Sequence, residues 1–231
     1  MKIEILATDD QLARRGAELI ASEARAAVAS RGQFVMAVSG GRNPWTMFGY
    51  LASQDVPWDK IDVVQVDERV APDGDPDRNL THLRESLLRR APLRPEQIHA
   101  MPVNDHDLRA AADRYAETLA KLSGRPPVID LVHLGMGPDG HTASLVPGDP
   151  VLNVADRDVA VTGVYQGRQR MTLTYPVLNR ARSILWLVSD QSKADALVRM
   201  VNGDPTIPAG RIRNDNAILL ADPAAASRLK S

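Results

Sequence analysis

Short apolar runs alternate along this chain with longer segments in which apolar residues recur every three or four positions. Runs rich in Val, Ile and Leu are typical of buried strands, whereas the longer recurrence indicates amphipathic helices. The predicted strands are residues 2–6, 34–39, 61–67, 129–135, 159–164, 170–175, 184–189 and 217–221. The predicted helices are residues 10–30, 42–53, 79–90, 104–122 and 190–201. Because strands and helices alternate, we expect an α/β fold with a mostly parallel sheet covered by helices.

The segments between these elements give no sign of a domain boundary. The loops are of ordinary length, and no internal repeat or low-complexity tract interrupts the pattern. A chain of 231 residues can bury one substantial core, so we expect a single domain over residues 1–231. In the predicted helix 42–53, we expect Asn43 to be the N-cap and Pro44 to occupy the first helical position.

The charge balance limits the ligands that the chain can attract. It has 28 basic and 29 acidic residues, and its formal net charge is -1. Such a chain has no broad basic field for nucleic acid or for an anionic membrane, so we expect neither as a partner. Any anion that binds must therefore bind at a local site.

The absence of cysteine excludes disulfides, thiolate nucleophiles and cysteine-ligated zinc. The five histidines form no H-x-x-x-H or H-x-H pair, so we expect no metal site. The N-terminus lacks the basic start and long apolar core of a signal peptide, and no apolar run is long enough to cross a bilayer. These features favour a cytoplasmic location.

The segment LGMGPDGHTAS, residues 134–144, carries glycines at the G-x-G-x-x-G spacing of dinucleotide-binding loops. In that motif the last glycine begins a crossover helix, but Pro147 and Pro150 would end any helix here within about two turns. A carboxylate at Asp139 would also repel a pyrophosphate. We therefore interpret the segment as a tight turn that presents Asp139 and His141. An isolated D-G-H is also typical of a plain solvated turn, whereas a carboxylate beside an imidazole can support proton transfer.

A second glycine turn, SGGRNP, follows the predicted strand 34–39 and begins a helix. Backbone N–H groups at Gly40 and Gly41, with a helix N-terminus behind them, form a potential anion site, and Arg42 can add a charge-assisted contact. The alternative is a plain strand-to-helix turn. The G-K-[ST] ending of a P-loop is absent, so a nucleoside triphosphate is not indicated.

Charged residues also stand where other predicted elements begin or end. Glu68 and Arg69 follow the strand 61–67, Arg170 begins another strand, and Lys193 lies near a helix start. Each of these residues can be a phosphate ligand or an ordinary surface charge. Their joint occurrence at strand ends, where α/β proteins bind ligands, favours the first interpretation.

Four stretches in this order, SGGRNP, VDERVAPDGDPDRN, LGMGPDGHTASLVPG and RMTLTYPVLNRA, together with Lys193, resemble the 6-phosphogluconolactonases. The resemblance covers essentially the whole chain. It implies a Rossmann-like, open, mostly parallel sheet with helices on both faces. It also implies hydrolysis of 6-phosphoglucono-1,5-lactone to 6-phosphogluconate in the pentose phosphate pathway, without a metal or another cofactor.

The resemblance also implies roles for individual residues. The family's proposed general base falls on His141, with Asp139 as its partner. Its phosphate and substrate contacts fall on Gly40, Gly41, Arg42, Glu68, Arg69, Arg170 and Lys193. Two assignments stay open at this point, because either Asp139 or Glu68 can orient His141, and Arg168 competes with Arg170 for its role.

Two other functions are weighed against this resemblance. Glucosamine-6-phosphate deaminases have a similar fold and glycine loop, but they carry a glutamate five residues after the histidine. Here that position is Val146, whose aliphatic side chain cannot move protons. A non-catalytic sugar-phosphate-sensing domain would normally accompany a DNA-binding element, which we do not expect in this chain.

The expected partner is a small sugar-phosphate lactone. We expect no obligate protein partner, and a monomer is favoured. The stretch VYQGRQR, residues 164–170, lacks the proline-rich run that is common at this place in the family, so the arrangement of this loop is not predicted.

Overall fold

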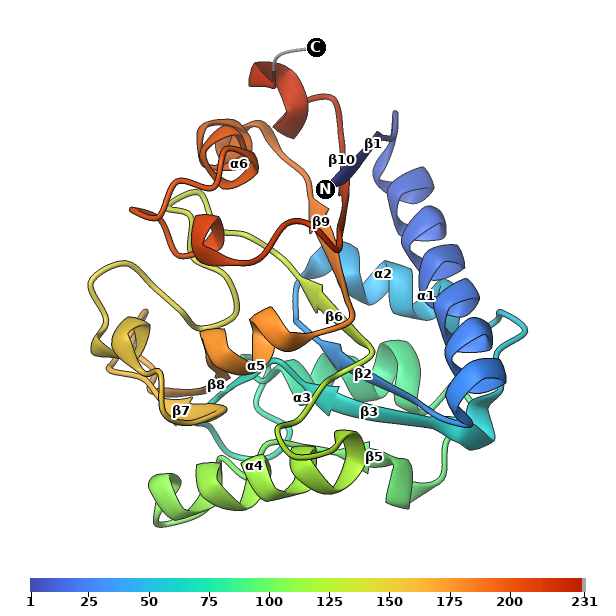
Figure 1. Cartoon of the computed structure of the whole chain (residues 1–231), viewed down its shortest axis with the longest axis vertical. Helices are drawn as coiled ribbons and strands as arrows, with labels where there is room; N and C mark the ends of the chain where they lie inside the picture. The colour runs from blue at the N-terminus through green and yellow to red at the C-terminus, as the bar shows by residue number, and fades with distance from the viewer. Residues whose placement is uncertain (230–231) are drawn as a thin grey trace.

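The computed structural model describes residues 1–229 and is built around a seven-stranded sheet (Figure 1). The strand order is β1-β10-β9-β6-β2-β3-β5, and all the neighbouring strands run parallel. The strands are β1 (Lys2–Ile5), β2 (Phe34–Val38), β3 (Ile61–Gln65), β5 (Ile98–His99), β6 (Leu131–Leu134), β9 (Ser183–Val188) and β10 (Ala217–Ala221). The predicted fold class, a mostly parallel sheet with helices on both faces, is confirmed.

Helices cover both faces of this sheet (Figure 1). The helices are α1 (Asp9–Arg31), α2 (Arg42–Leu51), α3 (Asn79–Leu83), α4 (Leu108–Ser123), α5 (Tyr175–Arg180) and α6 (Ala194–Val201). A π-helical turn, Arg84–Leu88, continues α3. Short 3₁₀ turns lie at Trp58–Lys60, Pro95–Gln97, Pro150–Asn153, Gln191–Lys193, Ala209–Arg211 and Ala225–Arg228. Helices α1, α2 and α3 pack on one face, and α4, α5 and α6 pack on the other.

Strand β2 shows why both faces need cover. Successive side chains of a strand point to opposite faces, so Phe34, Met36 and Val38 join the core beneath α1 and α2. Val35 and Ala37 join the core beneath α4 and α6. Every residue of this strand is buried, which explains the continuous apolar run in the sequence.

A second, antiparallel sheet contains β4 (Asp67–Arg69), β8 (Arg170–Leu173) and β7 (Val159–Val161), in the order β4-β8-β7. The predicted strands 159–164 and 170–175 belong to this sheet and not to the parallel one. The predicted strand 61–67 was also too long, because β3 ends at Gln65. Asp67 then pairs with Thr172 in the second sheet. Periodicity detects a strand but does not specify which sheet it joins.

Several predicted element ends differ from the structure. The N-cap of α2 is Gly41, so the prediction of Asn43 as the cap was wrong; the Asn43 side chain donates instead to the Ser189 hydroxyl at 2.6 Å. Helix α4 begins at Leu108, because Asp107 is its N-cap. Helix α5 was missed, since Tyr175 was assigned to a strand although the following proline favours a helix start.

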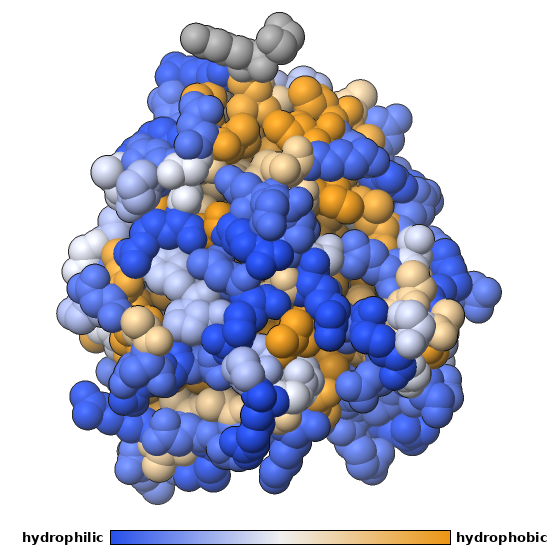
Figure 2. All heavy atoms as spheres, viewed as in Figure 1, coloured by the Kyte–Doolittle hydropathy of each residue, from blue (hydrophilic) through white to orange (hydrophobic). Residues whose placement is uncertain are grey.

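Polar and charged side chains cover most of the face drawn in Figure 2, and apolar side chains gather toward its upper end. Among the described residues, the large hydrophobic side chains that are most exposed belong to Ile3, Ile5 and Val164. Ile3 and Ile5 lie in β1, at an edge of the sheet. No helix within residues 1–229 combines the length and the apolar character needed to span a membrane.

Candidate active site

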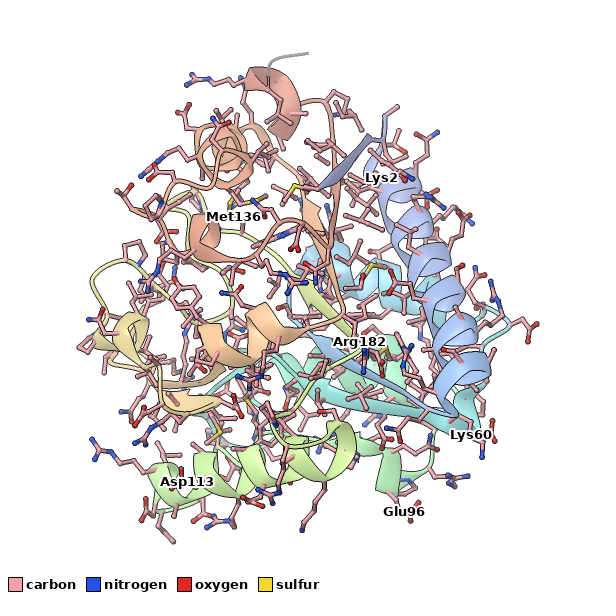
Figure 3. All side chains as sticks on the ribbon, viewed as in Figure 1. Lys2, Lys60, Glu96, Asp113, Met136 and Arg182 are labelled. Carbon is pink, nitrogen blue, oxygen red and sulfur yellow. The ribbon has the colours of Figure 1, made fainter. Side chains whose placement is uncertain are left out.

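A cleft of about 380 Å³ lies where β2, β6 and β9 end at their carboxyl ends. Ligands of open α/β sheets bind at such strand ends, and the volume falls within the range of small-molecule pockets. Met136, which is labelled in Figure 3, lines the cleft from the loop after β6. Seven of the nine predicted site residues also line it: Gly40, Gly41, Arg42, Arg69, His141, Arg170 and Lys193.

The loop after β6 folds into a tight turn that holds His141. The Gly137 N–H donates to the His141 carbonyl at 2.9 Å, and the Gly140 N–H donates to the Gly137 carbonyl at 3.0 Å. A Cβ at position 137 would overlap the His141 ring, so only glycine allows the imidazole to lie across the turn. No helix begins between this turn and Pro150 in the described chain. The predicted tight turn, with no crossover helix after its last glycine, is confirmed.

Asp139 and His141 form a hydrogen-bonded pair on this turn. Asp139 Oδ1 lies 2.6 Å from His141 Nδ1 and accepts the His141 backbone N–H at 3.1 Å. Burial alone would raise the pKa of Asp139, but the hydrogen bonds and positive charge of His141 lower it overall. An ionised carboxylate only accepts hydrogen bonds, so in the neutral form of the imidazole Nδ1 carries the proton and Nε2 has the lone pair. The pair is thus arranged for proton transfer through Nε2.

The turn between β2 and α2 forms another wall of the cleft. Gly40 lies against Asn79, and a Cβ at position 40 would overlap the Asn79 side chain. The N-cap of α2, Gly41, provides no side-chain hydrogen bond to the N–H groups of the first helical turn. A helix N-terminus without such a cap carries partial positive charge and free N–H donors, which suit an anion.

Two arginines lie opposite each other on neighbouring strands of the second sheet. Arg69 on β4 pairs directly with Arg170 on β8, and like charges at such positions repel. The pKa of Arg170 is lowered, first by burial and then by the charge of Arg69. Both Nε atoms are buried, and no described residue accepts a hydrogen bond from either. An anion bound between the guanidinium groups would relieve the repulsion and use these donors.

Lys193 reaches the same cleft from the 3₁₀ turn Gln191–Lys193, just before α6. Burial lowers the pKa of Lys193, although the nearby carboxylates of Asp190 and Asp139 raise it in part. The cleft therefore gathers four cationic side chains, those of Arg42, Arg69, Arg170 and Lys193, and a helix N-terminus beside the Asp139–His141 pair.

Glu68 occupies a different place from the one expected of a substrate contact. Its side chain is fully buried (0% exposed) and does not line the cleft. The carboxylate accepts the backbone N–H groups of Arg69, Asn79 and Leu80, each at 2.8 Å. It also accepts the Gln65 side-chain amide at 2.9 Å. Glu68 thus holds the loop behind the site, and the carboxylate in contact with His141 is Asp139.

The structure distinguishes Arg168 from Arg170 as a possible ligand contact. Arg168 Nη2 lies 3.0 Å from carboxylate oxygens of both Asp75 and Asp77, which hold it away from the cleft. Arg170 lines the cleft with only 4% of its surface exposed. Of the two, Arg170 is therefore the one placed to meet a ligand.

Residues that the sequence analysis did not nominate complete the walls. Asp67 lines the cleft and accepts the Ser144 hydroxyl at 2.6 Å, while the Asn79 amide donates to the Asp67 carbonyl at 3.0 Å. Asn43 and Ser189 also line the cleft. Asp67 was visible as a charge at a strand end, but nothing in the sequence indicated that Asn79 folds back onto it.

The family model of glucosamine-6-phosphate isomerases and 6-phosphogluconolactonases matches residues 7–220. The chain belongs to this family. A Nostoc protein named 6-phosphogluconolactonase is 35% identical over 235 residues, which cover 98% of each chain. A Mycobacterium tuberculosis protein of the same name is 36% identical over 243 residues, covering 99% of this chain and 98% of that one. The resemblance inferred from the sequence is confirmed.

Solved structures of the family agree with the fold. The crystal structure of a 6-phosphogluconolactonase from Thermotoga maritima has a TM-score of 0.85 and 25% identity, and it covers 96% of this chain and 98% of that one. A monomeric glucosamine-6-phosphate deaminase has a TM-score of 0.84 at 20% identity, which shows a common fold alone. Members with different activities therefore share one scaffold, so the residues of the cleft must decide between the activities.

Proposed function

We propose that this protein hydrolyses 6-phosphoglucono-1,5-lactone to 6-phosphogluconate, with His141 as the general base. The observation that carries the proposal is one cleft that joins the Asp139–His141 pair to a cationic end. A phosphorylated lactone needs both features, a site for its phosphate and a base near its carbonyl carbon. The curated relatives named 6-phosphogluconolactonase support the same substrate.

The phosphate group binds at the α2 N-terminus and between the cationic side chains of Arg69, Arg170 and Lys193. Charge-assisted hydrogen bonds from these groups are stronger than neutral ones and are made far from the reacting carbon. Such remote binding energy orients the lactone, so that the attack of water becomes nearly intramolecular. Arg42, at the start of α2, adds a further charge at the cleft.

His141 Nε2 removes a proton from a water molecule as its oxygen bonds to the lactone carbonyl carbon. The C=O π electrons move to the carbonyl oxygen, and a tetrahedral intermediate forms. When this intermediate collapses, the bond to the ring oxygen breaks and the imidazolium returns its proton to that oxygen. Asp139 stabilises the imidazolium between the two steps. General base catalysis of this kind contributes about 10²- to 10⁴-fold in rate.

The deaminase activity of the same family is disfavoured by the residue at position 146. That activity uses a glutamate five residues after the histidine, whereas Val146 is apolar and buried, with 5% of its surface exposed. Val146 has no group that can transfer a proton during ring opening or amine release.

The proposal is tested by offering the purified protein 6-phosphoglucono-1,5-lactone and glucosamine 6-phosphate in parallel, while following acid release and ammonia release. We expect acid from the lactone above its spontaneous hydrolysis, and no ammonia. His141→Ala is expected to lower kcat about 10²-fold or more, while substrate still binds. His106→Ala, which changes a histidine outside the cleft, serves as the matched control and keeps the wild-type rate. Ammonia without acid, or a wild-type kcat in His141→Ala, would overturn the proposal.

A further inference from the structure

The segment between β7 and β8, residues 162–169, forms a hairpin. Tyr165 and Arg168 exchange backbone hydrogen bonds of 2.9 and 3.2 Å. Between them, Gln166 and Gly167 both have positive φ, 51° and 76°, as a type I′ turn requires. The loop whose arrangement the sequence left open is thus a short, regular hairpin. Its first paired residue, Tyr165, faces the Asp139–His141 turn.

The hairpin is also anchored from its other side. Arg168 bridges to Asp75 and Asp77 in the loop between β4 and α3. A guanidinium held by two carboxylates limits the freedom of the chain around it, so the hairpin has a defined position relative to the cleft.

Tyr165 contacts three members of the proposed site at once. Its hydroxyl donates to Asp139 Oδ2 at 3.3 Å. Its ring meets the His141 ring edge-on, with the ring centroids 5.6 Å apart at 65°. The guanidinium carbon of Arg170 lies 5.0 Å from the centroid of the same ring. One half-buried side chain therefore lies between the proposed base and a proposed phosphate ligand.

The two oxygens of Asp139 have separate partners. Oδ1 accepts from His141, and Oδ2 accepts from Tyr165. Burial and the charge of Asp139 raise the pKa of Tyr165, so the hydroxyl keeps its proton and donates it. With both oxygens held, the carboxylate has one orientation, and the imidazole hydrogen-bonded to it is oriented too. The 3.3 Å separation is long for such a bond, and catalytic hydrogen bonds often shorten when substrate binds.

We propose that Tyr165 is a positioning residue of this site: its hydroxyl orients His141 through Asp139, and its ring supports Arg170. This inference rests on the proposed function. It predicts that the hydroxyl and the ring have separable effects, because the first acts on the base and the second on the phosphate ligand.

The first test is Tyr165→Phe, which removes only the hydroxyl. We expect kcat to fall about threefold to tenfold, the range that one hydrogen bond of ordinary strength supports, with KM changed less than about twofold. The acid limb of the kcat/KM profile is expected to move to higher pH. Without the hydroxyl, Asp139 keeps more negative charge and stabilises the imidazolium more, so His141 becomes more basic.

A second variant, Tyr165→Leu, also removes the ring. We expect the same loss of kcat together with a KM about threefold or more above that of Tyr165→Phe, because the Arg170 guanidinium loses its contact with the aromatic ring. The chain offers a matched control in Tyr50, whose hydroxyl donates to Asp10 and whose ring lies 4.1 Å from the Arg14 guanidinium carbon. Tyr50→Phe removes a Tyr–Asp hydrogen bond of the same kind outside the cleft and leaves kcat, KM and the pH profile unchanged.

The decisive comparison places Tyr165→Phe in an Asp139→Asn background. If the Tyr165 hydroxyl acts through the Asp139 carboxylate, Tyr165→Phe has no further effect on kcat in the Asp139→Asn background. An equal loss of kcat in both backgrounds, or a Tyr165→Phe enzyme identical to wild type in kcat and pH profile, would overturn the inference. Failure of the proposed function looks different, because the wild-type protein would then not hydrolyse the lactone, or His141→Ala would retain its kcat.

Discussion

Glu68→Gln tests whether this carboxylate supports the fold or contacts substrate. The carboxylate accepts four hydrogen bonds in a fully buried position, and Arg78 Nε lies 3.5 Å from Oε2. An amide at this place offers one acceptor oxygen in place of two, and it turns an NH₂ group toward N–H donors. It also removes the buried charge nearest to Arg78, which is itself buried and keeps only the exposed carboxylate of Asp73 at 3.8 Å.

Removing one partner of a buried ion pair costs about 3–5 kcal/mol of unfolding free energy. For a chain of this size that loss lowers Tm by about 6–20 °C, at about 2–4 °C for each kcal/mol. Thermal unfolding followed by calorimetry measures the shift, and urea titration at 25 °C gives the free energy. Glu96→Gln is the control, because that side chain is 77% exposed and lies away from the cleft (Figure 3).

Steady-state kinetics on the same variant, at a temperature where it is fully folded, complete the test. We expect the loss of stability to exceed any change in KM expressed as free energy, since Glu68 does not reach the cleft. An unchanged Tm with a KM raised about tenfold or more would refute this reasoning and return Glu68 to the substrate contacts.

Two further substitutions test the charge of the cleft and the buried histidine of the core. Lys193→Ala is expected to raise KM about tenfold or more with little change in kcat, because it removes a charge-assisted contact to the phosphate. Lys60→Ala, which changes an exposed lysine, is its control. An equal KM in the two variants would contradict the assignment of Lys193. Burial lowers the pKa of His133 to about 3, so the unfolded chain binds a proton below pH 6.5 that the folded protein does not bind. Stability is therefore expected to fall by up to about 1.4 kcal/mol per pH unit between pH 6.5 and 3. Urea unfolding of wild type and His133→Asn at pH 7 and pH 5 measures this contribution, which the variant lacks; an identical pH dependence in both would show that His133 titrates normally.

Much of the fold follows from local patterns in the sequence. The strand 34–39 was predictable because every residue of β2 is buried, which requires an unbroken apolar run. The turn at Asp139 and His141 was predictable because prolines stop any helix that could follow, and because the pair lies on one short loop. Both features depend on residues that are neighbours in the chain.

Features that depend on distant segments were not predictable in the same way. Glu68 has the charge and the strand-end position of a ligand contact, and only the return of residues 79 and 80 onto its carboxylate shows that it is buried. Asn43 is a residue type that often caps helices, but α2 begins one residue earlier, at Arg42. The Asn43 side-chain amide therefore donates to the Ser189 hydroxyl instead. Arg168 and Arg170 differ by two positions in the sequence, and their separate roles follow from the aspartates that hold Arg168.

The Asp139–His141 turn and the end of the cleft proposed to bind phosphate differ in how they depend on the rest of the chain. The turn closes within five residues, whereas Arg69 and Arg170 meet only when two strands of the antiparallel sheet pair across about a hundred residues of sequence. Local contacts form early and survive partial opening, while long-range pairings are lost first where stability is lowest. On the proposed function, a transient separation of β4 from β8 would therefore weaken the binding of the phosphate, while His141 keeps its hydrogen bond to Asp139. The proposed function thus implies that affinity for the ligand can fall while the proposed base stays in place, and that it returns when β4 and β8 pair again.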